Sequence, residues 1–205
     1  MRLIGNKKSP NVLVIGCFHG DEPQGKFLIE KYMTMVDSTN LLFIPCLNEY
    51  GFNHNTRTNE NQIDLNRNFP TLNWEQTEKN EFYGGNKPAS EVETQFVIET
   101  VEKYAPSVIL TLHAPYKVVN YDGGCKNSEF STKLIKRIAE IINYPIEPSI
   151  GYPTPGSFGT WAGVERDILT ITLELDEEIE IKALEKPVFE IFKLLEELEC
   201  KTLKN

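Results

Sequence analysis

The stretch VLVIGCFHGDE at Val12–Glu22 decides the fold class of this chain. Its first four residues are apolar and mostly β-branched, as in a strand that is covered on both faces of a sheet, and Gly16 ends the run. A helix is expected to begin directly afterwards, with Asp21 as its N-cap. In open α/β sheets, ligands bind where the carboxyl end of a strand leads into a helix. His19 and Glu22 lie at that place and are the first candidates for a metal site.

The composition narrows the classes of function. The chain has 205 residues, a formal net charge of −9 at pH 7 and a sequence pI of about 5.0, so its field repels nucleic acid and anionic membrane surfaces, and neither is expected as a partner. The four cysteines are far apart and have no paired spacing, which suits a reducing compartment. No apolar run is long enough for a membrane span, so a cytoplasmic protein is expected, and the oligomeric state stays open.

Further apolar runs predict the rest of the sheet. Leu41–Cys46 and Ser107–His113 show the same pattern of a buried strand, and Ile168–Leu175 alternates between apolar and polar residues. Helical spacing of apolar residues follows the first strand and recurs near residues 92–101, 134–142 and 184–198. We therefore expect an α/β domain of three layers, with a mostly parallel, mixed and twisted sheet of about six to eight strands between helices.

A long segment from Leu47 to about Ala89 shows no sustained periodicity. It is rich in Asn, Gly, Pro and Thr, and a loop of this length in a compact domain is usually functional or disordered. His54 lies in this segment without a second candidate ligand beside it, so we expect it to be an exposed polar residue.

Two histidines and two glutamates are expected to meet where the strands end. His19 and Glu22 follow the first strand, His113 ends a middle strand, and Glu174 lies near the end of the last. Zinc with three protein ligands keeps a fourth position for water and lowers the pKa of that water toward ~7, and a remaining glutamate can then move the proton. Taken alone, each residue has an ordinary structural explanation. A histidine that ends a strand, for example, is more often a hydrogen-bonded core residue than a ligand. The acidic residues near Glu174 in the sequence are expected on a solvated face: Glu165, Asp176, Glu177 and Glu178.

The ordered series of motifs resembles the zinc carboxypeptidase (M14) family. The motifs are HGDE, LNEYGF, TRTNENQIDLNRNFP, LHAPY and a glutamate at the end of a late strand, at positions 19–22, 47–52, 56–70, 112–116 and 174. KPASEVETQ, NYDGG and SIGYPTPGSFGTWAG, at positions 87–95, 120–124 and 149–163, resemble the murein tripeptide amidase branch of that family. The resemblance covers almost the whole chain, from Val12 to about Glu178. It departs at Asn48–Gly51, where NEYG replaces the Asn-Pro-Asp-Gly that is frequent in relatives.

The resemblance implies a zinc-carboxypeptidase-like fold in which residues 1–205 form a single catalytic domain. His19, Glu22 and His113 match the family's ligands for one zinc ion, and Glu174 matches its general base.

Residues of the long loop match the family's substrate contacts. Arg57 matches the arginine that helps to stabilise the oxyanion, and Asn66 and Arg67 match the pair that binds the C-terminal carboxylate of the substrate. Asp64 falls where relatives have a carboxylate that orients a zinc-bound histidine, although a turn-forming Asp is the alternative. Tyr152 matches the mobile tyrosine that caps the substrate, with packing of its Pro-rich loop as the alternative.

The resemblance implies a zinc-dependent metallopeptidase or amidase that hydrolyses a C-terminal amide bond of a small anionic peptide. Within the amidase branch, this bond joins the γ-carboxyl of D-glutamate to meso-diaminopimelate in murein peptides, as part of peptidoglycan recycling. Two alternatives stay open. The first is a deacylase of the aspartoacylase and succinylglutamate desuccinylase type, which shares HxxE, DLNR and the later histidine. The second is a non-catalytic peptide-binding relic of the fold.

Overall fold

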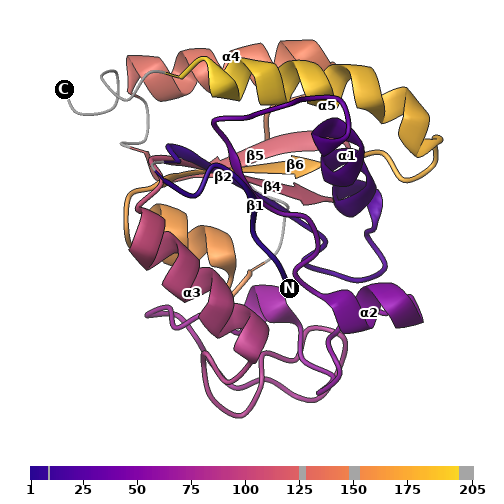
Figure 1. The fold of residues 1–205 in the computed structure, drawn as a ribbon. Coiled ribbons are helices and arrows are strands. Elements are labelled where there is room, and N and C mark those ends of the chain that lie inside the picture. The colour runs from indigo at the N-terminus through magenta and orange to yellow at the C-terminus, as the bar shows by residue number, and fades with distance from the viewer. Residues whose placement is uncertain (9, 125–127, 148–152, 199–205) are drawn as a thin grey trace.

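A six-stranded mixed sheet forms the centre of the computed structural model, which describes residues 1–8, 10–124, 128–147 and 153–198 (Figure 1). The strands are β1 Ile4–Gly5, β2 Val12–Gly16, β3 Leu42–Ile44, β4 Val108–His113, β5 Val118–Asp122 and β6 Leu169–Glu174. Their order across the sheet is β1-β3-β2-β4-β6-β5. β2 pairs in parallel with β3 and β4, and β4 pairs in parallel with β6, whereas the edge strands β1 and β5 are antiparallel. The expectation of a mostly parallel, mixed sheet is confirmed.

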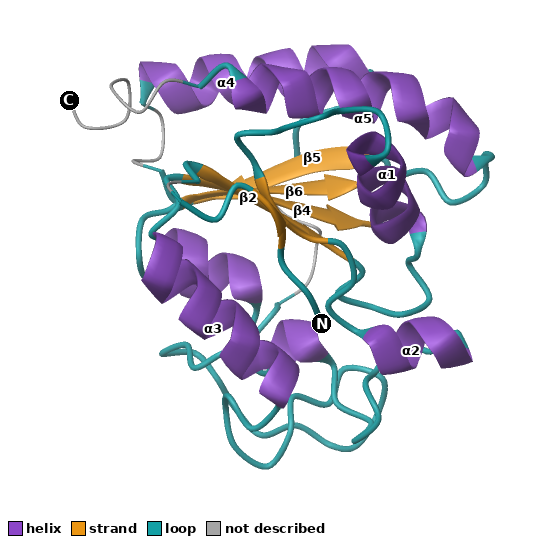
Figure 2. Cartoon of the chain, in the orientation of Figure 1, coloured by secondary structure: helices purple, strands orange, loops and turns teal. Residues whose placement is uncertain are grey.

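Helices cover both faces of this sheet (Figure 2). Their bounds are α1 Gln24–Met33, α2 Glu49–His54, α3 Val92–Tyr104, α4 Glu129–Ile142 and α5 Ile181–Glu196. One apolar core joins α1, α4 and α5 to one face of the sheet, and a second core joins α3, the long loop and a π-helical turn at Gly159–Val164 to the other face. The three-layer arrangement is therefore confirmed.

The start of α1 differs from the expectation. Its N-cap is Pro23, and no side chain caps it, so the prediction that Asp21 fills this place is wrong. Proline suits the start of a helix because its fixed φ matches the helical value and its missing N–H would have no intrahelical partner there. Asp21 is exposed in the turn between β2 and α1.

The long segment after β3 contains two short helical pieces where a continuous loop was expected. They are α2 and a 3₁₀ turn at Leu65–Arg67. Helical pieces this short have too few residues for a repeating apolar pattern to show in the sequence. α2 packs against the turn that follows β2, because a Cβ atom on Gly20 would overlap the backbone of Gly51. Only glycine permits this close approach.

The sheet brings three strand ends to one edge. Gly16 of β2 lies opposite Leu112 of β4, and His113 of β4 lies opposite Glu174 of β6. These strands are parallel, so their carboxyl ends meet at the same edge. Side chains that follow them are therefore close in space.

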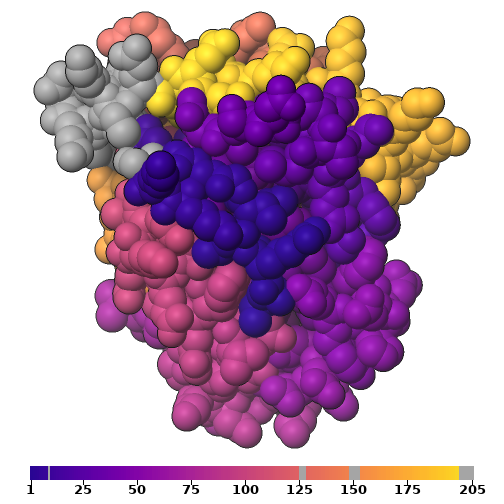
Figure 3. Space-filling view, in the orientation of Figure 1, coloured from indigo at the N-terminus to yellow at the C-terminus, as the bar shows by residue number. Residues whose placement is uncertain are grey.

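The surface view shows how the outer segments cover the sheet (Figure 3). The indigo amino-terminal segment lies on the surface, between the rose residues around α3 and the purple residues that include α1 and α2. Within the part of the chain that the structure describes, no helix has the length and apolar character needed to cross a membrane.

Candidate metal centre

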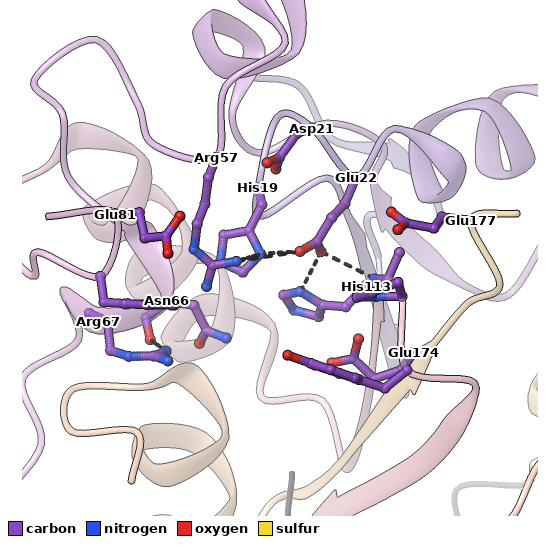
Figure 4. A pocket seen from close by; sticks show the side chains of 14 residues that line it. His19, Asp21, Glu22, Arg57, Asn66, Arg67, Glu81, His113, Glu174 and Glu177 are labelled. Carbon is purple, nitrogen blue, oxygen red and sulfur yellow. Dashed lines mark hydrogen bonds and ion pairs between the residues drawn. The ribbon is translucent and has the colours of Figure 1, made fainter. Parts of the chain in front are cut away.

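Three buried side chains converge where β2 and β4 end (Figure 4). One ligand atom each from His19, Glu22 and His113 lies within 4.8 Å of the other two. Glu22 Oε1 is 2.7 Å from His19 Nδ1, and Glu22 Oε2 is 2.9 Å from His113 Nδ1. Both imidazoles therefore turn their Nδ1 atoms toward the same carboxylate.

Local backbone geometry sets this arrangement. His19 and Glu22 lie in the turn after β2, which closes through a hydrogen bond of 3.2 Å from Glu22 N to His19 O. His113 is the last residue of β4, and the parallel register with β2 brings it beside that turn. Ala114 N also donates to Glu22 Oε2 at 3.3 Å, so the backbone after β4 helps to fix the carboxylate.

Asp64 links His19 to Arg57. Asp64 Oδ1 is 3.1 Å from His19 Nε2, and Arg57 donates to Asp64 Oδ2 from Nε at 3.1 Å and from Nη2 at 2.9 Å. Burial alone would raise the pKa of Asp64, but His19 and Arg57 hold this pKa well below its ordinary value. Asp64 Oδ1 also accepts from Asn66 N at 2.8 Å and caps the 3₁₀ turn. The turn-forming role and the contact with the histidine are thus both present.

The pKa values of the two histidines are shifted in opposite directions. Burial lowers the pKa of His19, but the carboxylates of Glu22 and Asp64 outweigh it and raise this pKa to about 9. The pKa of His113 lies below its ordinary value, because burial outweighs the single carboxylate of Glu22. A metal ion would therefore displace a proton from His19 and meet His113 in its neutral form.

Glu174 lies beside this cluster as the last residue of β6. The residue is 6% exposed, and its Oε2 atom has no hydrogen-bond partner within the described part of the chain. Burial, together with the charge of Glu22, raises the pKa of Glu174 to about 8. A buried carboxyl oxygen without a protein partner fits a site that receives an ion or a ligand.

A cavity of about 290 Å³ opens over these side chains (Figure 4). Arg57, Asn66 and Arg67 line it together with the cluster and Glu174. Asn66 Oδ1 accepts a hydrogen bond of 2.8 Å from Phe158 N, and Arg67 Nη1 donates to Asn66 O at 2.7 Å. The cavity thus gathers His19, Glu22, His113, Glu174, Arg57, Asn66 and Arg67, which the sequence singled out as ligands, base and substrate contacts. The other lining residues are Asp21, Glu81, Phe82, Ala114, Pro115, Tyr116 and Glu177.

Two aromatic residues at this cavity were not expected from the sequence. Phe82 and Tyr116 are 38% and 53% exposed. The ring centroid of Phe82 lies 5.1 Å from Cζ of Arg57 and 5.8 Å from Cζ of Arg67. Tyr116 ends the LHAPY motif, so the sequence offered a sign that it lies near the site. Nothing around Phe82 in the sequence indicates its contacts with the two arginines. Glu177 is exposed, as expected, but also lines the cavity.

Further residues that the sequence singled out are not among the described residues that line the cavity. Tyr152 is outside the described residues, so its expected role as a substrate cap stays a prediction. His54 is exposed on α2, as expected. Cys17 and Cys46 are buried free thiols.

The donor set suits a divalent transition metal. Two imidazole nitrogens and one carboxylate oxygen are a recurring set of protein ligands for catalytic zinc, which keeps a fourth position for water. The contact of His19 Nε2 with Asp64 matches the second hydrogen bond that metal-binding histidines generally make. The residues present therefore fit a zinc ion.

Comparisons with known proteins agree with this chemistry. A family model described as zinc carboxypeptidase matches residues 4–186. Murein peptide amidase A of Escherichia coli K12 is 29% identical over 197 residues, which cover 89% of this chain and 78% of that protein. Murein peptide amidase A of Vibrio campbellii is 35% identical over 134 residues, which cover 58% of this chain and 50% of that protein. The crystal structure of murein-tripeptide amidase from Escherichia coli O157 has a TM-score of 0.80 at 26% identity, covering 96% of this chain and 84% of that one.

Proposed function

This chain belongs to the zinc carboxypeptidase family and is a hydrolase, and from that premise we propose that it cleaves the amide bond between D-glutamate and meso-diaminopimelate in murein peptides. The bond joins the γ-carboxyl of D-glutamate to the amine of diaminopimelate. Two relatives that are named as murein peptide amidases support this substrate class. The proposal assigns the reaction to peptidoglycan recycling in a bacterial cytoplasm, with residues 1–205 acting as one catalytic domain.

We assign one zinc ion to His19 Nδ1, His113 Nδ1 and a carboxylate oxygen of Glu22. The observation that carries the proposal is the convergence of these three ligand atoms within 4.8 Å, beside the unpartnered Oε2 atom of Glu174. When bound, zinc would polarise the scissile carbonyl and lower the pKa of the attacking water toward ~7. Asp64 would keep His19 Nδ1 directed at the metal by accepting the Nε2 proton.

Asn66 and Arg67 would bind the C-terminal carboxylate of the substrate. A guanidinium group can meet a carboxylate through two parallel hydrogen bonds, and the bond from Arg67 to Asn66 O fixes this arginine in the cavity. Local cations of this kind explain how a protein with a net charge of −9 accepts an anionic peptide.

Glu174 would accept a proton from the attacking water at Oε2 and return it to the nitrogen of the leaving amine. Burial raises the pKa of Glu174 to about 8 in the metal-free protein, and a bound cation beside it would lower this pKa toward the neutral range, where a group can both accept and donate a proton. Arg57 would donate to the carbonyl oxygen as that oxygen gains negative charge. Two hydrogen bonds to Asp64 orient the guanidinium group before the substrate arrives.

Metal analysis followed by a substrate panel tests this function. The purified protein is analysed for zinc and then incubated separately with γ-D-glutamyl-meso-diaminopimelate, an ordinary L-peptide and an N-acyl amino acid, and the products are identified by mass. Release of diaminopimelate from the first substrate alone supports the proposal. Cleavage of only the N-acyl amino acid would favour the deacylase, and zinc binding without any turnover would favour the peptide-binding relic.

A further inference from the structure

The imidazole of His113 stacks on the ring of Phe18. The two ring centroids are 5.3 Å apart and the ring planes differ by 22°, which is an offset-stacked arrangement. Phe18 is fully buried and directly precedes His19 in the turn after β2. One residue of this turn therefore contacts the proposed ligand from β4, and the next residue is itself a proposed ligand.

The two proposed histidine ligands are held in different ways. His19 has a carboxylate at each ring nitrogen, because Glu22 lies at Nδ1 and Asp64 at Nε2. His113 contacts Glu22 through Nδ1, and no residue that the structure describes forms a hydrogen bond with its Nε2 atom. Metal-binding histidines generally use a second hydrogen bond to fix the ring. For His113, contacts with the faces of the ring have to supply this constraint.

Phe18 provides the stacked contact. Among the rings that the structure describes, the only other one against His113 is that of His19, which is tilted by 58° at a centroid distance of 5.1 Å. A tilted ring touches its neighbour through an edge, whereas a stacked ring covers a face. The plane of the His113 imidazole is therefore defined by Phe18.

The ring of Phe18 belongs to a buried aromatic block with Phe69 and Phe158. Its centroid lies 6.3 Å from that of Phe69 and 5.4 Å from that of Phe158. The centroids of Phe69 and Phe158 are 5.1 Å apart, and at most 2% of either residue is exposed. Because a close-packed interior resists rearrangement, the aromatic block prevents Phe18 from turning away from His113. Phe18 is thus a rigid support for one face of the imidazole.

We propose that Phe18 is a positioning residue of the metal site, whose ring fixes the plane of the His113 imidazole and keeps Nδ1 directed at the ion. This inference rests on the proposed function, in which His113 is a zinc ligand. Phe18 does by stacking for His113 what Asp64 does by a hydrogen bond for His19. Without the ring, the imidazole can rotate about its side-chain bonds and take Nδ1 away from the ion, so metal affinity should fall.

The test compares Phe18→Leu with Phe69→Leu. Each substitution removes one fully buried ring from the aromatic block, but among the described contacts only the ring of Phe18 stacks on His113. Urea denaturation measures stability, and competition with a chelator measures the zinc affinity of the folded protein. Both variants should be less stable than the wild type. Only Phe18→Leu should bind zinc more weakly, by about two- to tenfold, the factor that corresponds to the energy of an aromatic pair.

Cobalt(II) gives a spectroscopic measure of the same ligand geometry. The visible absorption of this ion depends on how its ligands are arranged, so the cobalt-loaded Phe18→Leu protein should differ in spectrum from the wild type. Cobalt-loaded Phe69→Leu should have the wild-type spectrum. A residue that only stabilises the core would change neither the spectrum nor the zinc affinity. Phe18→Met is a second variant without the ring and takes the place of Phe18→Leu if the leucine variant does not fold.

The outcomes separate this inference from the proposed function. Wild-type zinc affinity in Phe18→Leu, or an equal loss of affinity in Phe18→Leu and Phe69→Leu, would overturn the inference and leave the function intact. An unchanged cobalt spectrum in Phe18→Leu would do the same. A wild-type protein that binds no zinc would overturn the proposed metal site itself.

Discussion

The catalytic cluster and the binding loop are built in different ways. The catalytic cluster, which consists of His19, Glu22, His113 and Glu174, lies at the ends of strands whose register is fixed by the sheet. The binding loop, residues 55–91, connects α2 to α3 and carries the proposed substrate contacts. Only its short 3₁₀ turn is regular.

A network of polar side chains, of which Asn59, Asn68 and Glu91 are buried, holds the binding loop. Glu91 accepts hydrogen bonds from Asn59 Nδ2 and Asn61 Nδ2, both at 2.7 Å, and from Ser90 Oγ at 2.6 Å. The buried Asn68 donates from Nδ2 to two backbone carbonyls of the same loop. The pairing of the strands thus positions the catalytic cluster, whereas side-chain hydrogen bonds hold the binding loop with its proposed substrate contacts. Mutations in the two regions should therefore have different kinetic effects.

The largest effect should come from Glu174→Gln in the catalytic cluster. Glutamine keeps the shape of the side chain but cannot accept a proton, so kcat should fall by about 10²- to 10⁴-fold. Zinc content, measured by elemental analysis, should stay at the wild-type value because Glu174 is not assigned as a ligand. A loss of zinc along with activity would show that Glu174 also helps to hold the metal, which contradicts its assignment as a base and not a ligand.

Arg67→Ala in the binding loop should act mainly on KM. Hydrogen bonds to charged groups contribute about 1.5–3 kcal/mol, so KM should rise by roughly 10- to 150-fold while kcat changes little. Steady-state kinetics on γ-D-glutamyl-meso-diaminopimelate measure both constants, and Arg67→Lys should restore part of the binding. A fall in kcat at unchanged KM would show that Arg67 acts in the chemical step, which contradicts the proposed separation of roles between the two regions.

Zinc binding should depend on the protonation of His19. The pKa of about 9 in the metal-free protein lies above the ordinary 6.5, and a protonated Nδ1 cannot bind a metal. Apparent zinc affinity should therefore rise by up to about tenfold per pH unit as the pH approaches 9, and level off above it. Competition with a chelator between pH 6.5 and 9.5 measures this slope. A constant affinity below pH 8 would show that His19 is already neutral there.

Glu91→Gln should weaken the binding loop and leave the catalytic cluster intact. An amide has one acceptor oxygen in place of two, so at least one hydrogen bond to Glu91 is lost, and the free energy of unfolding should fall by about 1–3 kcal/mol. Urea denaturation measures this change. Glu99→Gln on the exposed face of α3 is the control. KM should rise in Glu91→Gln, and unchanged zinc affinity would show that the two regions respond independently.

Phe82→Leu should have the smallest effect. The ring of Phe82 lies against Arg57 and Arg67, and such cation–π contacts contribute about 0.5–1 kcal/mol at exposed sites. A loss of this contact energy corresponds to a roughly two- to fivefold fall in kcat/KM. Phe82→Tyr keeps the aromatic face and should retain wild-type kinetics. Identical kinetics in the Leu and Tyr variants would show that the ring does not orient the arginines.

The sequence predicts the catalytic cluster more directly than the binding loop. His113 and Glu174 end apolar runs, and parallel pairing leaves few ways to arrange such strand ends. Asp64 and its neighbours could be assigned only through family motifs, because a loop has no period to reveal them. The positions of Glu81 and Phe82 depend on the path of the loop through space, which no local pattern specifies. β1 and α2 were missed because they are too short to show a period.

The contact between Gly20 and Gly51 has a consequence for protein engineering. No side chain fits between the two backbones, so any displacement of α2 would push directly on the turn that carries His19. Loops exchanged between family members should therefore be joined after α2, at Asn55 or beyond. A chimera spliced there would import a new substrate preference while the recipient keeps its own spacing of metal ligands.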